Sequence, residues 1–141
     1  IIQTYSPENP VIKCATELNV EKYYKICLEE RKSLLYPPFS WMVKLEIRGK
    51  NINEVEKSIN KIKNRMIRLP MGLSILGPAL CYREKLRDYY RMQLILKSNK
   101  ELDVNGSKLH KYYKSIISKG AGLKIPSNQR LIIDINPVSL L

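Results

Sequence analysis

The sequence predicts an α+β sandwich over residues 36–141, with a four-stranded sheet and two helices on one face. Apolar and polar residues alternate in "SWMVKLEIRG", a pattern typical of a half-buried strand. Apolar residues at helical spacing follow, and the order strand-helix-strand-strand-helix-strand continues to "LIIDI". This order suits the split ferredoxin-like arrangement, which places both helices on the same face of the sheet.

An appendage precedes this domain in the prediction. The segment "IIQTYSPENPVI" is typical of a short strand, Ile1 to Tyr5, that ends at a proline-rich turn. From Asn19 to Leu35 the apolar residues fall near one stripe, which predicts a helix with Asn19 as its cap. The following "YPPF" ends the helix, because proline disfavours helical geometry in the residue before it. We therefore place the boundary between appendage and domain at Tyr36–Phe39.

The first helix of the main domain is expected after "SWMVKLEIRG". Asn53 with Glu56 makes an approximate capping box, and Pro70 with Gly72 closes the helix. Its apolar positions, which recur at helical spacing, are Val55, Ile59, Ile62, Met66 and Leu69. These positions predict which face of the helix packs on the sheet.

Two strands and a second helix complete the predicted domain. We expect a short strand in "LSILGP", broken at Gly77-Pro78, and a longer strand from about Tyr89 to Lys97. A second helix begins near Ser107 and ends at Gly120 or Gly122. The last strand, "LIIDI", stops at the proline that follows it.

The charge balance predicts a polyanionic partner. The 25 lysine and arginine residues outnumber 13 acidic ones, which gives a formal charge of +12 and a pI near 9.7. Such an excess favours nucleic acid first and an acidic protein tail second. The alternative is a lysine-rich surface that only keeps the protein hydrated.

Membrane and secretion signals are not expected. The longest apolar runs are a few residues, well below the roughly 18 that cross a bilayer, so we expect a soluble protein without a membrane partner. The start of the chain lacks a basic region followed by an apolar one, the pattern of a signal peptide. It also lacks an initiating methionine, so we expect a piece of a longer protein.

The sequence offers little for catalysis. It contains no P-loop, no Gly-x-Gly-x-x-Gly motif and no Gly-x-Ser-x-Gly elbow. Cys14, Cys27 and Cys81 are far apart and His110 is the single histidine, which argues against a zinc site and favours reduced thiols. We expect no catalytic residue, no metal ligand and no cofactor site in this chain by itself.

The candidate nucleic-acid contacts lie mainly in "GPALCYREKLRDYYRMQLIL", residues 77–96. Cationic side chains there lie among tyrosines, and this combination suits phosphates together with unpaired bases that stack on rings. The candidates are Arg83, Lys85, Arg87, Tyr89 and Arg91, with Lys57, Lys61 and Arg65 from the outer face of the first helix. The alternative is a hairpin edge whose cations discourage sheet-to-sheet aggregation.

Four separated motifs carry a family resemblance. "IIQTYSPENPVI", "YYKICLEERKSLLYPPFS", "LGPALCYREKLRDYYRMQLILK" and "IDINPVSLL", in this order, resemble the C-terminal part of the PriA (primosomal protein N′) family. Its members are replication-restart DNA helicases of superfamily 2. The resemblance implies that residues 1–35 are the tail of the second helicase lobe. Residues 36–141 would be the C-terminal domain, with a fold likened to a small ribosomal protein, which binds branched DNA and lies against the helicase core.

The resemblance also implies cofactors and partners. The intact protein would be a cytoplasmic, nucleoid-associated bacterial helicase that uses ATP and magnesium, and its zinc-binding cysteines would lie upstream of this chain. Its partners would be forked or single-stranded DNA, the acidic tail of the single-stranded DNA-binding protein and other primosome proteins. Two alternatives stay open: a non-catalytic docking module for that acidic tail, and a free-standing RNA-binding protein.

This chain departs from the family pattern at several positions. Relatives often have Gly-Pro-Ala-Pro-Ala where Leu80 and Cys81 complete the motif here. They often have Gly-Arg-Tyr-Arg-Trp where this chain begins with Asp88 and ends with Met92, so one arginine and one tryptophan are missing. The usual Asp-Val-Asp-Pro contains Asn136 at its third position.

Overall fold

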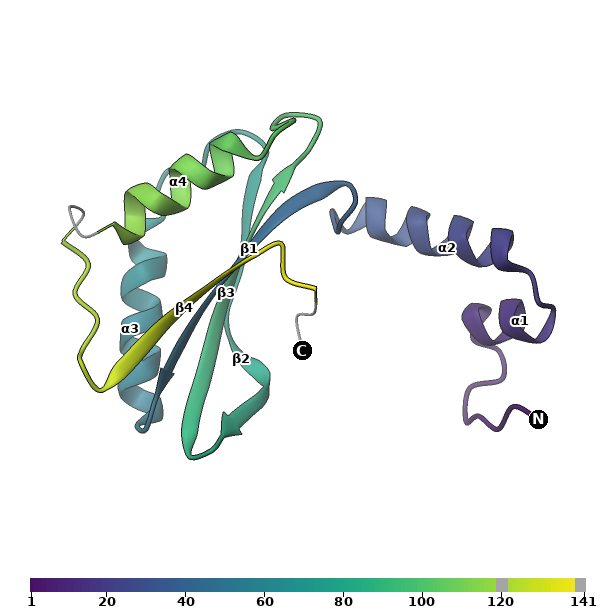
Figure 1. Cartoon of the computed structure of the whole chain (residues 1–141), viewed down its shortest axis with the longest axis horizontal. Coiled ribbons are helices and arrows are strands. Elements are labelled where there is room, and N and C mark those ends of the chain that lie inside the picture. Colours follow the sequence, from purple (N-terminus) through teal and green to yellow (C-terminus); the bar gives the residue numbers. More distant parts are fainter. Residues whose placement is uncertain (119–121, 139–141) are drawn as a thin grey trace.

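A four-stranded antiparallel sheet in the order β2-β3-β1-β4 forms the centre of the computed structural model (Figure 1). The structure describes residues 1–118 and 122–138. The strands are β1 (Ser40–Gly49), β2 (Leu73–Leu86), β3 (Tyr89–Asn99) and β4 (Gln129–Ile135). Helices α3 (Ile52–Arg65) and α4 (Ser107–Ile117) pack on the sheet. The predicted α+β class and the strand-helix order are confirmed.

The hydrophobic core lies between the sheet and these two helices. Alternate residues of β1 and β3 point toward the helices, and every third or fourth residue of α3 and α4 points back. The core includes Val43, Leu45, Ile47, Leu94, Leu96, Val55, Ile59, Ile62, Met66, Leu109, Tyr113 and Ile116. The predicted apolar positions are therefore confirmed, except for Leu69, which lies beyond the helix and is 41% exposed.

The ends of α3 differ from the prediction. The side chain of Asn51, two residues before Asn53, accepts hydrogen bonds from the backbone amides of Asn53 and Glu54, so Asn51 is the N-cap. The helix ends at Arg65, before Pro70 is reached, because Met66 leaves the helical conformation. The expected capping box was therefore wrong by two residues.

The prediction of a half-buried β1 was wrong, because both faces of this strand are buried. Met42, Lys44 and Glu46, which point away from the helices, are as covered as the core residues. Residues 34, 36–37 and 137–138 lie beside Met42 on that face. Lys44 and Glu46 belong to a cluster of ion pairs on the same face. The alternation of polar and apolar residues in β1 therefore does not mean that its polar face is exposed to solvent.

Strand β2 continues through Gly77-Pro78, where a break was expected. Gly77 has a φ of 96°, and the pairing with β3 shifts register between Leu76 and Ala79, as in a β-bulge. A side chain at Gly77 would place its Cβ 2.8 Å from the carbonyl oxygen of Gln93, so glycine is required there. As a result, the stretch 77–96 forms one long, irregular hairpin.

Helices α1 (Pro10–Thr16) and α2 (Val20–Ser33) project away from the sheet (Figure 1). Asn19 caps α2 as predicted, since its side chain accepts a 3.0 Å hydrogen bond from the amide of Lys22. The predicted strand Ile1–Tyr5 was wrong, because this segment pairs with no other strand in the described part of the chain. The helix α1 was not predicted.

The end of α4 was expected at Gly120 or Gly122. The helix ends at Ile117, and Ser118 already has an extended conformation. Gly122 lies beyond the helix, whereas Gly120 is outside the described residues. Among the described residues, no helix is long and apolar enough to cross a membrane.

Candidate nucleic-acid interface

A tight two-residue turn brings two of the predicted contact residues to the end of the sheet. Leu86 pairs with Tyr89, and the turn residues Arg87 and Asp88 have φ values of 48° and 63°. Positive φ at both turn positions is the geometry of a type I′ hairpin. Lys85, one residue before Leu86, forms an ion pair of 3.2 Å with Asp88.

The hairpin end lines a depression that we call the arginine groove. It has a volume of about 530 Å³ and is lined by Arg48, Leu86, Arg87, Tyr89, Ser127, Asn128, Gln129 and Arg130. These residues come from the end of β1, the hairpin between β2 and β3, and the start of β4, which meet at the lower end of the sheet in Figure 1. Among the described residues, the lining contains three arginines and no carboxylate. Sequence reasoning predicted Arg87 and Tyr89 but missed Arg48 and Arg130.

Three arginines lie side by side across the sheet. In the strand register, Arg48 of β1 is opposite Arg91 of β3 on one side and Arg130 of β4 on the other. Like charges that face each other across strands are destabilising. Glu46 neutralises part of this row, whereas the side chain of Arg130 is exposed and has no ion pair within the described residues.

Glu46 is the centre of the ion-pair cluster and is 1% exposed. Its carboxylate accepts hydrogen bonds of 2.8 and 3.0 Å from Arg91 and one from Arg48, and Lys44 Nζ lies 3.8 Å away. Burial by itself would raise the pKa of Glu46, but the hydrogen bonds and charges of the two arginines lower it to about 2. Three cations around one carboxylate leave this side of the sheet positively charged.

The structure places Arg91 inside this cluster. Its side chain is bound to Glu46 and the residue is 8% exposed, so the guanidinium is not presented to solvent beside Arg83 and Arg87. The pKa of Arg91 is raised mainly by its hydrogen bond to Glu46. Arg83 is exposed on β2, outside the arginine groove. Of the hairpin candidates, only Arg87 and Tyr89 line the groove.

The three candidates on α3 form a separate surface. Lys57, Lys61 and Arg65 are spaced four residues apart and line a shallow depression of about 710 Å³ together with Glu56. The amides of Asn53, Asn60 and Asn64 complete that lining. Arg65 Nη2 donates a 3.1 Å hydrogen bond to the carbonyl oxygen of Gly122. This surface belongs to the helical layer and shares no lining residue with the arginine groove.

No candidate metal site is found in residues 1–118 and 122–138. No group of three or more histidine, cysteine or acidic side chains is close enough to hold a metal ion in these ranges. All three cysteines are free thiols. Burial, reinforced by the charge of Glu46, raises the pKa of Cys81 to about 11, so this thiol stays protonated at neutral pH. The described residues thus do not fit a bound zinc ion.

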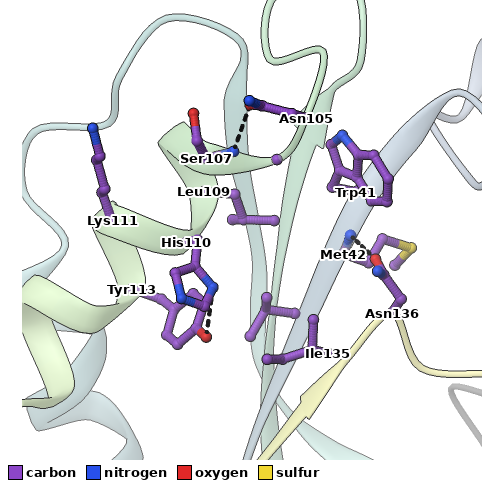
Figure 2. A pocket seen from close by; sticks show the side chains of 12 residues that line it. Trp41, Met42, Asn105, Ser107, Leu109, His110, Lys111, Tyr113, Ile135 and Asn136 are labelled. Carbon is purple, nitrogen blue, oxygen red and sulfur yellow. Dashed lines mark hydrogen bonds between the residues drawn. The ribbon is translucent and has the colours of Figure 1, made fainter.

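A second pocket lies between the start of α4, strand β1 and the end of strand β4. Figure 2 shows Trp41, Met42 and Asn136 on one side, with Leu109, His110 and Tyr113 of α4 across from them. The pocket has a volume of about 380 Å³, and Lys111 also lines it. Lys100 Nζ lies 4.1 Å from the centre of the Trp41 ring, which adds a cation near an apolar wall.

Comparison with known proteins matches most of this chain. The model of the family described as "Primosomal protein N C-terminal domain" matches residues 32–138. The replication restart protein PriA of Thermotoga maritima is 37% identical over 98 residues, which cover 70% of this chain and 13% of that protein. The proteins of the same name from Synechocystis and Rickettsia felis are 33% and 32% identical, and the matches cover 99% and 98% of this chain. The chain spans between 13% and 20% of the length of these three relatives.

Proposed function

The chain belongs to the primosomal protein N C-terminal domain family of PriA proteins, and from this premise we propose that it is the C-terminal part of an ATP-dependent replication-restart DNA helicase. Its role is to bind branched or single-stranded DNA and to dock on the helicase core during primosome assembly. In this proposal, residues 1–35 are the tail of the second helicase lobe and residues 36–141 are the binding domain. The domain is a split ferredoxin-like sandwich, similar to a small ribosomal protein. ATP, magnesium and zinc act in other parts of the intact, cytoplasmic protein.

The observation that carries DNA binding is the composition of the arginine groove. The residues that line it include three arginines and no carboxylate, and they include Tyr89, a tyrosine that is 40% exposed. Guanidinium groups bind phosphate oxygens with two parallel hydrogen bonds, and an exposed ring offers a face on which a base can stack. The groove therefore has the chemistry that a DNA strand requires.

Fluorescence anisotropy tests this proposal with the 141-residue chain and with forked, single-stranded and duplex DNA at two salt concentrations. The double variant Arg87→Glu/Arg130→Glu removes two phosphate contacts. It should lower the affinity and reduce the slope of log affinity against log salt by about 1.4 for single strands, because each phosphate contact contributes about 0.7. The matched control, Lys25→Glu/Lys114→Glu, makes the same change in net charge at exposed positions outside the groove.

An affinity that falls equally in both double variants would mean that only the net charge matters, and it would remove the groove from the DNA site. No binding to any of the three DNAs would reject the proposed function itself. Because long-range attraction acts on both variants alike, the difference between them measures the local contacts.

The pocket beside α4 favours docking of an acidic peptide tail as a second candidate function. Trp41, Met42 and Val43 give it apolar walls, and Lys111 and the nearby Lys100 provide positive charge. Apolar pockets with cations at the edge recognise acidic peptides through charge and side-chain contacts. The tail of the single-stranded DNA-binding protein is the partner we propose.

Titration with an acidic tail peptide in the absence of DNA tests this second function. The variant Lys111→Glu should weaken peptide binding and leave DNA affinity close to that of Lys114→Glu, its matched control on the same helix. Equal peptide affinity in both variants would reject the pocket as the docking site. The third reading, a free-standing RNA-binding protein, predicts instead that RNA binds more tightly than DNA of the same length.

A further inference from the structure

The hairpin end keeps a strained cationic residue where uncharged residues would be more stable. Type I′ turns favour Asn-Gly because both turn positions need a positive φ. Residues other than asparagine, aspartate and glycine adopt this backbone conformation only at a cost in free energy. Arg87 occupies the first position with a φ of 48°. Such strain persists where the surrounding structure imposes it, and it concentrates at functional sites. The side chain of Arg87 lines the arginine groove.

The lining of the groove contains a second unfavourable arrangement. Arg130 is directly opposite Arg48 across the β1–β4 pair, and Glu46 binds Arg48 but not Arg130. Two arginines at facing positions repel each other unless an anion lies between or beside them. Arg130 and Arg87, which form no ion pair with any described residue, thus place two guanidinium groups on the walls of one depression.

Tyr89 belongs to the lining of the same groove. Tyr89 is 40% exposed as a residue, and its ring takes part in no ring stacking or cation–π contact within the described residues. Its neighbour Tyr90 differs, because Lys85 Nζ lies 5.4 Å from the centre of the Tyr90 ring. Among the described residues, no aromatic ring or cation therefore occupies the face of the Tyr89 ring.

The volume of the groove fits a ligand about as large as one nucleotide, and the state of the bases decides which kind of DNA can enter it. A concave site of about 530 Å³ suits a small-molecule unit, since pockets for such ligands range from roughly 300 to 1,000 Å³. Duplex DNA is read instead by protruding elements that enter its grooves, and its bases are hidden in the stack. A base can reach a ring inside a depression only when it is unpaired.

We propose that the arginine groove holds one unpaired nucleotide of a DNA strand, with its base stacked on Tyr89 and its flanking phosphates bound by Arg87 and Arg130. This inference rests on the proposed function and specifies its ligand. It assigns stacking to a single ring and phosphate binding to residues from two separate parts of the chain. The base and phosphate contacts are therefore separable by mutation.

The test measures the affinity of the 141-residue chain for three DNAs of equal charge per strand: a thymidine 15-mer, the same 15-mer with abasic sugars throughout, and a duplex. Tyr89→Leu should weaken binding to the thymidine 15-mer about fivefold or more, the cost of losing one stacked base. It should leave affinity for the abasic strand and the duplex unchanged. Tyr82→Leu is the matched control, because Tyr82 is 76% exposed on β2 and lies outside the groove.

Arg87→Asn separates phosphate binding from the fold, because asparagine tolerates the left-handed conformation of this turn. This variant should weaken binding to both the thymidine and the abasic strands. The inference is overturned if Tyr89→Leu changes both strands equally, or if it behaves as Tyr82→Leu does. If the unaltered chain binds none of the DNAs, the proposed function fails as well, so the two failures are distinguishable.

Discussion

The ion-pair cluster around Glu46 makes a quantitative prediction about stability. Glu46→Gln keeps the size of the side chain but removes the charge that binds Arg91 and Arg48. The carboxylate pKa falls from 4.5 to about 2 in the folded protein. Lowering a pKa by one corresponds to about 1.4 kcal/mol, so the charged form contributes about 3 kcal/mol to the free energy of unfolding. Removing one partner of a buried ion pair costs roughly 3–5 kcal/mol, which agrees with this value.

The pH dependence distinguishes this charge effect from a packing defect. A carboxylate with a lowered pKa stabilises the fold above its unfolded pKa, and that contribution is lost as the pH falls from about 4.5 toward 2. The variant is already uncharged at residue 46, so it lacks this loss. The difference in stability between the unaltered chain and Glu46→Gln should be about 3 kcal/mol at pH 7 and approach zero near pH 2.

Urea unfolding followed by circular dichroism at about pH 7, 5, 4, 3 and 2 measures this difference directly. Other carboxylates also titrate in this range, and they cancel when the two proteins are compared at the same pH. A difference that stays constant from about pH 7 to pH 2 would refute the charge argument, and one below about 1 kcal/mol at pH 7 would show that Glu46 is not a buried ion-pair partner.

Three further predictions concern local structure. Asp103 accepts hydrogen bonds from Leu109 and the preceding amide at the start of α4, so Asp103→Asn should lower the free energy of unfolding by about 1–3 kcal/mol in urea titrations, and an unchanged midpoint would contradict this. Gly77→Ala forces a Cβ to 2.8 Å from the carbonyl oxygen of Gln93 and should lower Tm by several degrees; an unchanged Tm would mean that the bulge is not required. Arg87→Asn should keep or raise Tm in calorimetry, because the turn is relieved of strain, whereas a lower Tm would show that Arg87 stabilises the hairpin.

The sequence pattern predicted the elements that depend on local chemistry. The core face of α3 followed from Val55, Ile59 and Ile62 at helical spacing, and Asn19 was identified as a cap from its position before the apolar stripe. Both features are determined by neighbours a few residues away. The prediction that the strand breaks at Gly77-Pro78 was wrong, because a β-bulge and a strand end use the same residue types. Local sequence by itself does not distinguish the two.

The site depends on contacts between distant segments, which the pattern does not contain. Arg91 is held by Glu46, 45 residues earlier, through the register of β1 and β3. Arg130 meets Arg48 through the register of β1 and β4. Cationic residues at the ends of the predicted strands were the signal for this site that the sequence offered. In an antiparallel sheet the end of one strand lies beside the start of its neighbour, so such residues can meet at one end of the sheet. Without the strand order, such cations are indistinguishable from ordinary surface charge.

The most direct test of the central claim is to map DNA contacts by two-dimensional NMR while a single-stranded oligonucleotide is added to the isotope-labelled 141-residue chain. If DNA binds in the arginine groove, amide shifts should concentrate at Arg48, residues 86–89 and residues 127–130; the groove is lined by Arg48, Leu86, Arg87, Tyr89 and residues 127–130. Shifts confined to the outer face of α3 around Lys57 and Lys61, or no shifts at all, would contradict it.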